Sequence, residues 1–179
     1  MVDNQQNYGV VYDRNDYAGF FKRVAIALID FSVVCLVVVA VFFATTFLNL
    51  DDDDFLALNY IWAVVFSIGY LGLLRRSRFR TLGYIIANVK IVDLKGNRPS
   101  AFKMILRTGL LILGPFEFFI DIAWLTSEIT KQTLRDKYVG TYVVAMDASP
   151  VGRGTLKTVT LGVMGWSLMY KEVKDIQYS

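Results

Sequence analysis

The 179-residue chain lacks histidine altogether and contains a single cysteine. Without histidine, the chain cannot form a Ser-His-Asp or Cys-His triad, a histidine-ligated zinc site or a histidine proton relay. Because Cys35 stands alone, an intrachain disulfide is excluded as well. We therefore expect no catalytic residues, no metal site and no cofactor, and we predict that the protein is not an enzyme.

Charge is also scarce, since only 20% of the residues are charged and 55% are hydrophobic. The mean hydropathy is +0.44, a value that a water-soluble domain of this length rarely sustains. The composition predicts a small integral membrane protein, and the length allows one membrane module. We expect three parts: a polar N-terminal segment at 1–22, a membrane domain at 23–146 and a C-terminal tail at 147–179.

Two stretches of 20 residues lack any formal charge: Phe31 to Leu50 and Phe55 to Leu74. At about 1.5 Å per residue, each is long enough to cross the roughly 30 Å core of a bilayer as a helix. The second stretch has Tyr60 and Trp62 near one end and Tyr70 near the other, as is typical of interfacial aromatic residues. The sequence therefore predicts two transmembrane helices.

The charges around these helices predict their orientation. The connection from Asp51 to Asp54 has four carboxylates and no cation. The outer flanks of the two helices instead carry basic residues: Arg14, Lys22, Arg23, Arg75, Arg76, Arg78 and Arg80. The positive-inside rule then places both termini in the cytoplasm, with the chain crossing the membrane more than once. The basic residues thus indicate topology rather than nucleic-acid binding.

A third apolar region, Phe102 to Ser127, is interrupted by charges and by Gly114-Pro115 near its middle. Proline tends to kink or end a helix, so the region reads as two arms of roughly 12 residues, each too short to span. We favour a re-entrant or interfacial helical hairpin over a single crossing. The hairpin would keep every lysine and arginine of the chain on the cytoplasmic side.

Short β-prone runs complete the expected fold, which is mainly α in a membrane with a small cytoplasmic β element. Val89 to Asp93 and Gly140 to Met146 are expected to pair, because neither strand is stable alone. The tail alternates apolar and polar residues around Val159 to Val163. This alternation favours a β-hairpin that turns near Gly165, and an amphipathic interfacial helix is the competing interpretation.

Two further patterns are weaker than they first look. Consecutive aspartates at 51–54 suggest a calcium site, but calcium loops alternate ligands with spacers, so a solvated loop is favoured. The run from Gly152 to Thr158 is similar to a phosphate-binding loop, but Leu156 stands where that loop needs glycine before Lys157. We expect neither metal nor nucleotide binding.

Four spaced motifs resemble the RDD family of small bacterial membrane proteins, named for one arginine and two aspartates. The motifs are GFFKRVAIALID from Gly19, RTLGYIIANVKIVDLKGNRPS from Arg80, ILRTGLL from Ile105 and QTLRDKYVGTYVV from Gln132. The resemblance implies that Arg23 is the family arginine, Asp30 the first aspartate and Asp136 the second. Some members of the family are implicated in sodium/proton exchange.

Two positions depart from the family pattern. Arg135 stands where the family usually has histidine before the second aspartate, and Tyr84 stands where a lysine usually follows the Thr-Leu-Gly motif. Any mechanism that needs that histidine is therefore unavailable to this chain. The tail beyond Asp147 has no counterpart in the pattern, which suggests that it adapts this member to a partner of its own.

The acidic residues near the membrane allow two interpretations. Asp30 abuts the first charge-free stretch, where an unpaired acid is costly, so we expect it to pair with Arg107 or Arg135. In a functional interpretation, Asp30 joins Glu117 and Asp121 in an acidic cluster that exchanges a proton for a cation. In a structural interpretation, the acids pair with arginines and hold the helices and the cytoplasmic sheet together.

We favour the structural interpretation. It predicts a non-catalytic accessory or scaffold subunit of a larger membrane complex, in contact with the lipid bilayer and with other membrane subunits. The alternative is a homo-oligomeric cation/proton exchanger, because two helices alone make a thin wall for an ion path. Neither hypothesis involves nucleic acid or nucleotide.

Overall fold

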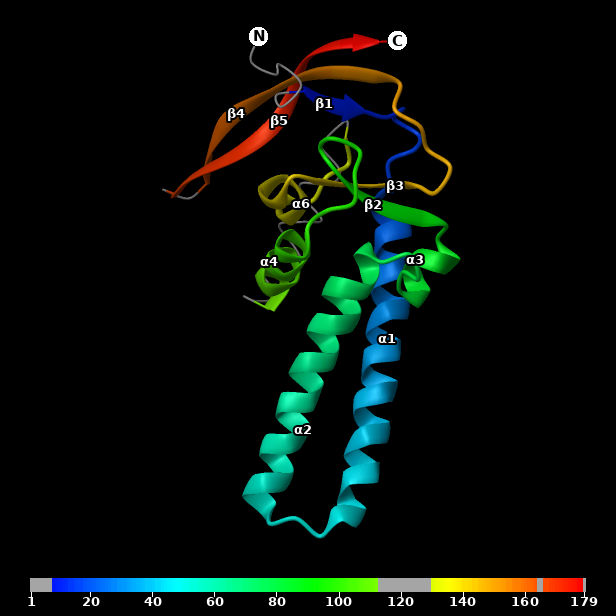
Figure 1. Ribbon diagram of the computed structural model, residues 1–179, viewed down its shortest axis with the longest axis vertical. Helices are drawn as coiled ribbons and strands as arrows, with labels where there is room; N and C mark the ends of the chain where they lie inside the picture. Colours follow the sequence, from blue (N-terminus) through cyan, green and yellow to red (C-terminus); the bar gives the residue numbers. More distant parts are fainter. Residues whose placement is uncertain (1–7, 113–129, 164–165, 179) are drawn as a thin grey trace.

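The computed structural model describes residues 8–112, 130–163 and 166–178, and the structural statements below concern those residues. Two long helices lie side by side and extend away from a head that contains two small sheets (Figure 1). The helices are α1 (Phe20–Thr45), extended by the 3-10 turn η2 (Thr46–Leu48), and α2 (Asp52–Ser67), extended by the π-helix η3 (Ile68–Leu74). The turn between them lies at the far end from the head (Figure 1).

The turn between the long helices follows from local backbone and side-chain chemistry. Asn49 adopts a left-handed conformation (φ 49°) directly after η2, as asparagine tolerates at helix ends. Asp52, Asp53 and Asp54 occupy the first turn of α2, where negative charge is favourable. Asn59 Nδ2 donates to Thr45 Oγ1 at 3.0 Å and ties the two helices together near the turn.

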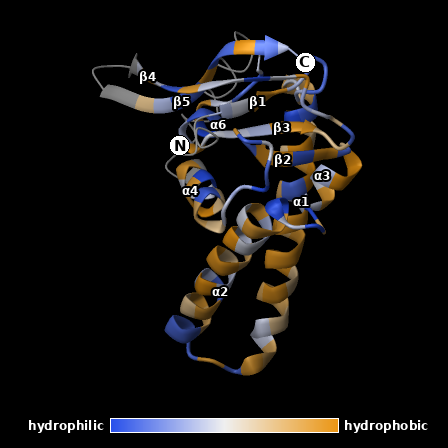
Figure 2. Ribbon diagram, turned by 45° about the horizontal axis from the view of Figure 1, so that its top comes forward, coloured by the Kyte–Doolittle hydropathy of each residue, from blue (hydrophilic) through white to orange (hydrophobic). Residues whose placement is uncertain are grey.

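Both long helices are hydrophobic along most of their length (Figure 2). Their candidate spans, Phe20–Leu48 and Asp52–Leu74, are long and apolar enough to cross a membrane, yet only 11% and 6% of their most apolar windows are buried. Leu36 is 70% exposed and Phe43 63% exposed. A soluble core helix would bury such side chains, so these surfaces need an apolar environment. The second predicted span, Phe55 to Leu74, lies within α2 and η3, and the first, Phe31 to Leu50, lies within α1 and η2 except for its last two residues.

The first head sheet pairs the two strands that the sequence analysis expected to pair. β2 (Val89–Asp93) and β3 (Thr141–Ala145) run antiparallel, with Val89 opposite Ala145 and Asp93 opposite Thr141. The short helix α3 (Leu82–Ile86) precedes β2, and α6 (Leu134–Val139) precedes β3. The predicted pairing is confirmed.

The third apolar region begins as α4 (Ala101–Ile112), a 12-residue helix that agrees with the expected first arm. Residues 113–129 lie outside the described part of the chain, and with them the Gly114-Pro115 turn and the second arm. α4 contacts both η3 and α6. The choice between a helical hairpin and a single crossing depends on residues 113–129, so the hairpin stays a prediction.

The second sheet joins the two ends of the chain in the order β1-β4-β5. β1 (Tyr8–Val11) pairs antiparallel with β4 (Gly152–Val163), which pairs antiparallel with β5 (Trp166–Tyr178). The predicted tail β-hairpin is confirmed over the described residues, and the expected turn near Gly165 lies outside them. The polar N-terminal segment and the tail thus share one sheet.

Two small hydrophobic clusters form the core of the head, and one of them joins the head to α1. Met104 and Val89 belong to the first cluster, which also contains Ile26 of α1. The second cluster surrounds three tyrosines, Tyr12, Tyr17 and Tyr142, whose rings meet edge to face with centroids 5.5–6.4 Å apart. The head is therefore packed directly against the start of α1.

Candidate functional site

The first arginine–aspartate cluster forms around Asp30, whose side chain is fully buried in α1. Arg75, at the end of η3, donates to Asp30 Oδ2 from Nη2 at 2.9 Å and from Nε at 3.2 Å. Thr81 Oγ1 donates to the same oxygen at 2.8 Å, and the Gly83 backbone N–H donates to Oδ1 at 2.8 Å. Tyr70 adds a longer contact of 3.4 Å from its hydroxyl. We call these five residues the Asp30 cluster.

The Asp30 cluster corrects one expectation from the sequence. We expected Arg107 or Arg135 to pair with Asp30, but the guanidinium that binds it is Arg75. The reason is topological: α2 and η3 run back alongside α1 and return Arg75 to the level of Asp30. Arg107 instead binds Asp136 at 2.7 Å, and Arg135 lies next to Asp136 on α6.

The Asp30 cluster depends on a close backbone approach at Gly83. A Cβ added there would lie 2.7 Å from the Ile26 carbonyl oxygen and 2.8 Å from Asp30 Oδ1. We expect Gly83→Ala to lower the free energy of unfolding by about 1–3 kcal/mol, because α3 must move away from α1. The measurement is thermal unfolding in detergent. Gly69→Ala is the matched control, since nothing lies within 4 Å of its Cβ position, and equal stability of the two variants would contradict the prediction.

The second cluster forms around Asp136, which is also fully buried. Arg23 Nη1 lies 2.6 Å from Asp136 Oδ2, and Arg107 Nη2 lies 2.7 Å from Oδ1. Asp136 also completes a capping box with Thr133 at the start of α6. Thr141 Oγ1 donates to Oδ1 at 3.4 Å. These residues, Arg23, Arg107, Thr133, Asp136 and Thr141, form the Asp136 cluster.

Arg23 contacts two further segments of the chain besides its ion-pair partner Asp136. Its Nε donates to the Ala18 carbonyl at 2.9 Å, and its Nη2 donates to the Lys131 carbonyl at 2.9 Å. All three donor groups of this planar side chain are therefore used, which a lysine could not reproduce. The two family residues Arg23 and Asp136, 113 positions apart, meet directly.

The charge of Asp136 is strongly favoured by its surroundings. Burial alone would raise the pKa of Asp136, but the guanidiniums of Arg107 and Arg23 outweigh burial and hold that pKa well below its usual range. The carboxyl is therefore ionised at neutral pH. A depressed folded-state pKa means that the ionised carboxyl stabilises the fold above its ordinary pKa of about 4.

This pKa shift predicts how stability depends on pH. The contribution of Asp136 is fully present above about pH 5 and is lost as the pH falls toward the depressed folded-state pKa. Because the chain has no histidine, we expect the melting temperature to change little between pH 8 and 6 and to fall below pH 4. Thermal unfolding against pH tests this, with Asp136→Asn as the comparison. An equally steep acid loss in that variant would contradict the assignment.

The proposed acidic cluster is only partly within the described chain. Asp30 is described, whereas Glu117 and Asp121 lie outside the described residues. In the described ranges no group of three or more Cys, Asp or Glu is arranged to hold a metal ion. Asp30 is surrounded there by hydrogen-bond donors rather than by other acids.

Sequence reasoning missed Arg75, Thr81 and Gly83. Arg75 opens the arginine run after the second span, and that run by itself indicates only topology. Thr81 and Gly83 belong to the RTLG motif, whose Thr and Gly could have indicated a tight backbone approach. Tyr84, which departs from the family pattern, is buried, and the Arg75 guanidinium lies 5.4 Å from its ring centroid.

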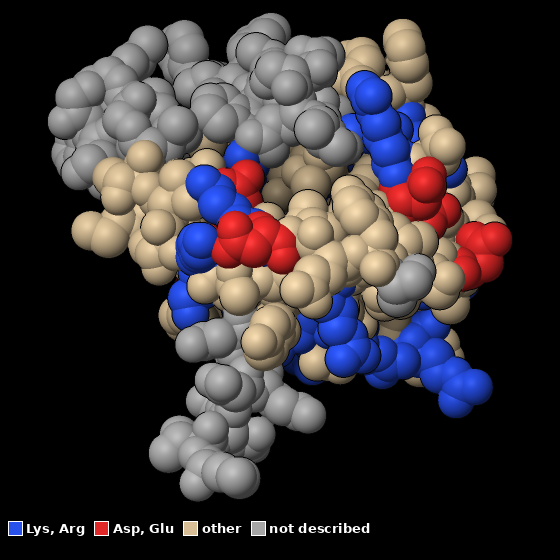
Figure 3. Space-filling model, turned by 90° about the horizontal axis from the view of Figure 1, so that it is seen from above, with Lys and Arg blue, Asp and Glu red and all other residues tan. Residues whose placement is uncertain are grey.

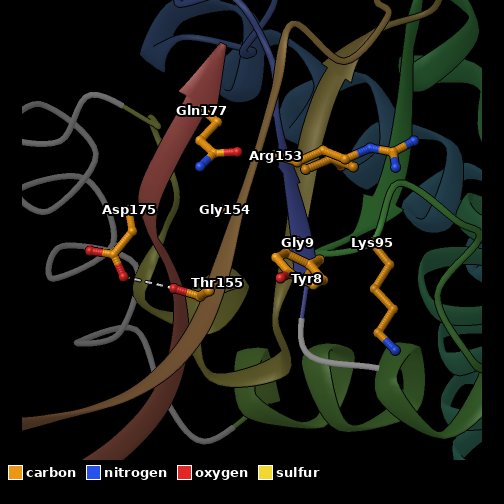
Figure 4. Close-up of a pocket in the computed structure, with 9 residues that line it drawn as sticks. Tyr8, Gly9, Lys95, Arg153, Gly154, Thr155, Asp175 and Gln177 are labelled. Atoms are coloured by element: carbon orange, nitrogen blue, oxygen red, sulfur yellow. Dashed lines mark hydrogen bonds between the residues drawn. The ribbon is translucent and has the colours of Figure 1, made fainter. Parts of the chain in front are cut away.

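A separate open cavity of about 550 Å³ lies on the second sheet, between β1, β4 and β5 (Figure 4). Asp175 lies on one side of it and Lys95 on the other. Asp175 Oδ2 accepts from Thr155 Oγ1 at 2.8 Å and pairs with Lys157 at 2.7 Å. Its carboxylate is thus already engaged within the hairpin.

The geometry defines a protein in which two long apolar helices are fastened to a polar head by buried arginine–aspartate clusters. Residues 17–140 match the RDD family, which is more than half of the chain, so the protein belongs to the RDD family, a bacterial membrane-associated family. The resemblance drawn from the four motifs is confirmed. No curated protein and no solved structure matches the chain significantly. The tail hairpin, from Gly152 onward, lies beyond the family match.

Proposed function

We propose that the protein is a non-catalytic accessory or scaffold subunit of a membrane complex in the bacterial inner membrane. The observation that carries the proposal is that both family aspartates are fully buried and bound by arginines. Each aspartate joins segments far apart in the chain: Asp30 binds residues 40–53 positions away, and Asp136 binds Arg23 and Arg107. Such contacts fix the head on the helices, which is the requirement of a scaffold.

The charge distribution supports a multi-pass arrangement with both termini in the cytoplasm. Between Val24 and Leu74 the chain contains no lysine or arginine, and the acidic turn from Asp51 to Asp54 lies at the end remote from the head. Every basic residue in the described ranges therefore belongs to the head or its junction with the helices. The positive-inside rule favours a cytoplasmic head.

The surroundings of Asp30 favour this role over cation/proton exchange. A carboxylate that exchanges ions must release its partners in every cycle, whereas Asp30 is held by Arg75, Thr81 and the Gly83 backbone. Removing one partner of a buried ion pair leaves the other charge uncompensated. Such an arrangement is suited to holding α3 and the head permanently against α1.

The tail hairpin is the surface that best suits a partner subunit. β5 has β4 as its neighbour and forms the outer strand of the sheet. It carries exposed apolar side chains, with Met169 70% exposed and Tyr178 73% exposed. A long outer strand with exposed apolar residues is a ready template for pairing with another chain.

Extraction from the native membrane in mild detergent tests the proposal. We expect a stoichiometric complex that contains unrelated subunits, measured by native mass and subunit composition. Met169→Asp should release those subunits without lowering the melting temperature of the protein, because the side chain is exposed. A pure homo-oligomer would contradict the scaffold role and favour the exchanger that uses Asp30, Glu117 and Asp121.

A further inference from the structure

A small basic cavity lies where the second long helix enters the head. It has a volume of about 230 Å³ and is bordered by the turn that follows η3, by β2 and by the turn after β2. Six cationic side chains line it: Arg75, Arg76, Arg78, Arg80, Lys90 and Arg98. No carboxylate is among its lining residues. Seen from the head, Lys and Arg gather along the lower edge of the molecule with no Asp or Glu between them (Figure 3).

Three of these cations have hydrogen-bond partners in the described chain: Arg75, Arg80 and Lys90. Arg80 Nη1 donates to the Val89 carbonyl at 3.2 Å. Arg75 belongs to the Asp30 cluster, and Lys90 Nζ donates to the Ala148 carbonyl at 3.0 Å. Arg78 and Arg98 are exposed at the rim. So many like charges around a small cavity repel one another unless an anion offsets them.

Arg80 shows that the cavity is a built feature. Its backbone adopts a left-handed conformation (φ 55°), which costs a non-glycine residue free energy. The turn is held by Ser77 Oγ, which accepts from the backbone N–H groups of Phe79 at 3.1 Å and Arg80 at 3.3 Å. Arg80 Nε is buried and has no hydrogen-bond partner in the described chain. A strained backbone that holds a buried guanidinium N–H without a partner is typical of a ligand site.

Apolar side chains beside the cavity indicate where its ligand comes from. Phe79, in the same turn, is 79% exposed. The short helix α3 that follows presents Leu82, Ile85 and Ile86, which are 47%, 47% and 62% exposed. Exposed apolar residues next to a row of cations match the boundary between the acyl chains and the headgroups of a bilayer.

We propose that this cavity binds the phosphate of an anionic phospholipid headgroup in the cytoplasmic leaflet. The inference rests on the membrane placement in the proposed function but not on any partner subunit. Phe79 and the exposed face of α3 enter the apolar edge of the leaflet, and the arginines receive the phosphate, for which guanidinium geometry is well suited. Because Arg75 lines the same cavity and binds Asp30, a bound headgroup lies directly against the Asp30 cluster.

Lipid titration of the purified full chain tests this site. The protein is held in a neutral detergent, and binding is followed by native mass spectrometry with phosphatidylglycerol, with phosphatidylcholine and with inorganic phosphate alone. We expect phosphatidylglycerol to bind at least tenfold more tightly than phosphatidylcholine. We expect inorganic phosphate to leave the protein unoccupied at the same concentrations, since it lacks the acyl chains.

Charge-neutralising variants separate the cavity from general surface charge. Arg78→Gln with Arg98→Gln removes two rim cations that are exposed and make no ion pair in the described chain. Each cation near an anionic lipid strengthens binding by roughly fivefold, so the double variant should bind phosphatidylglycerol roughly 25-fold more weakly. Arg14→Gln with Lys22→Gln is the matched control, because both residues are exposed and lie outside the cavity.

Three results would overturn the proposal. One is equal affinity for phosphatidylglycerol and phosphatidylcholine, and another is an equal loss in both double variants, which would mean unspecific charge attraction. The third is binding of inorganic phosphate as tight as that of the lipid, which would assign the cavity to a soluble phosphate. All three concern the isolated protein, so they are distinguishable from failure of the scaffold role, which is measured by subunit composition.

Discussion

Asp136→Asn is expected to lower the free energy of unfolding by about 3–5 kcal/mol, the usual cost of removing one partner from a buried ion pair. The asparagine keeps the shape of the side chain but leaves Arg23 and Arg107 without their shared carboxylate. For a protein of this length, the loss corresponds to a fall in melting temperature of about 6–20 °C. Thermal unfolding in detergent measures it at pH 7.

Asp175→Asn is the matched control for this prediction. Asp175 also forms an ion pair, with Lys157, but both side chains are more than half exposed. Exposed ion pairs are screened by water and contribute little to stability. The control variant should therefore have the same melting temperature as the wild type. Equal melting temperatures for Asp136→Asn and the wild type would show that the Asp136 cluster does not hold the head in place.

Asp30→Asn is the second variant with a large expected effect. It leaves the Arg75 guanidinium beside a neutral amide in a fully buried position, which is destabilising by several kcal/mol. We expect both a lower melting temperature and loss of the partner subunits after extraction in mild detergent. The loss of assembly follows because α3 and the head are fixed to α1 through this carboxylate.

A double variant identifies the cause of that effect. Asp30→Asn combined with Arg75→Gln removes both charges, so its stability loss should be smaller than the sum of the two single losses by about 1–3 kcal/mol. Asp54→Asn, in the acidic turn at the far end of α2, is the control and should leave stability and assembly unchanged. Strictly additive losses would mean that Asp30 and Arg75 act independently.

The elements that depend on local pattern were predictable from the sequence. The two long helices follow from uninterrupted apolar runs, and the β2–β3 pairing follows from two short strands that need each other. The tail hairpin follows from alternation around Val159–Val163, which favoured a strand over an interfacial helix. In each case the helix or strand assignment itself rests on a short run of neighbouring residues.

The ion-pair partners were not predictable in the same way. Nothing local distinguishes Arg75 from the other arginines that follow the second span, and only the return of α2 along α1 brings it to Asp30. Similarly, Arg23 and Asp136 meet because α6 returns to the start of α1. Arg107, one of the two partners expected for Asp30, binds Asp136 instead. Sequence spacing does not reveal which helix ends lie next to each other.

Proton-coupled cation flux in vesicles is the most direct test of the central claim, that the buried aspartates are structural tethers rather than ion carriers. The purified protein would be reconstituted, a sodium or potassium gradient imposed, and the internal pH followed with a trapped dye. The account predicts that wild type and Asp30→Asn both give the rate of protein-free vesicles. Flux in the wild type that Asp30→Asn abolishes, while the variant remains folded and assembled, would contradict it.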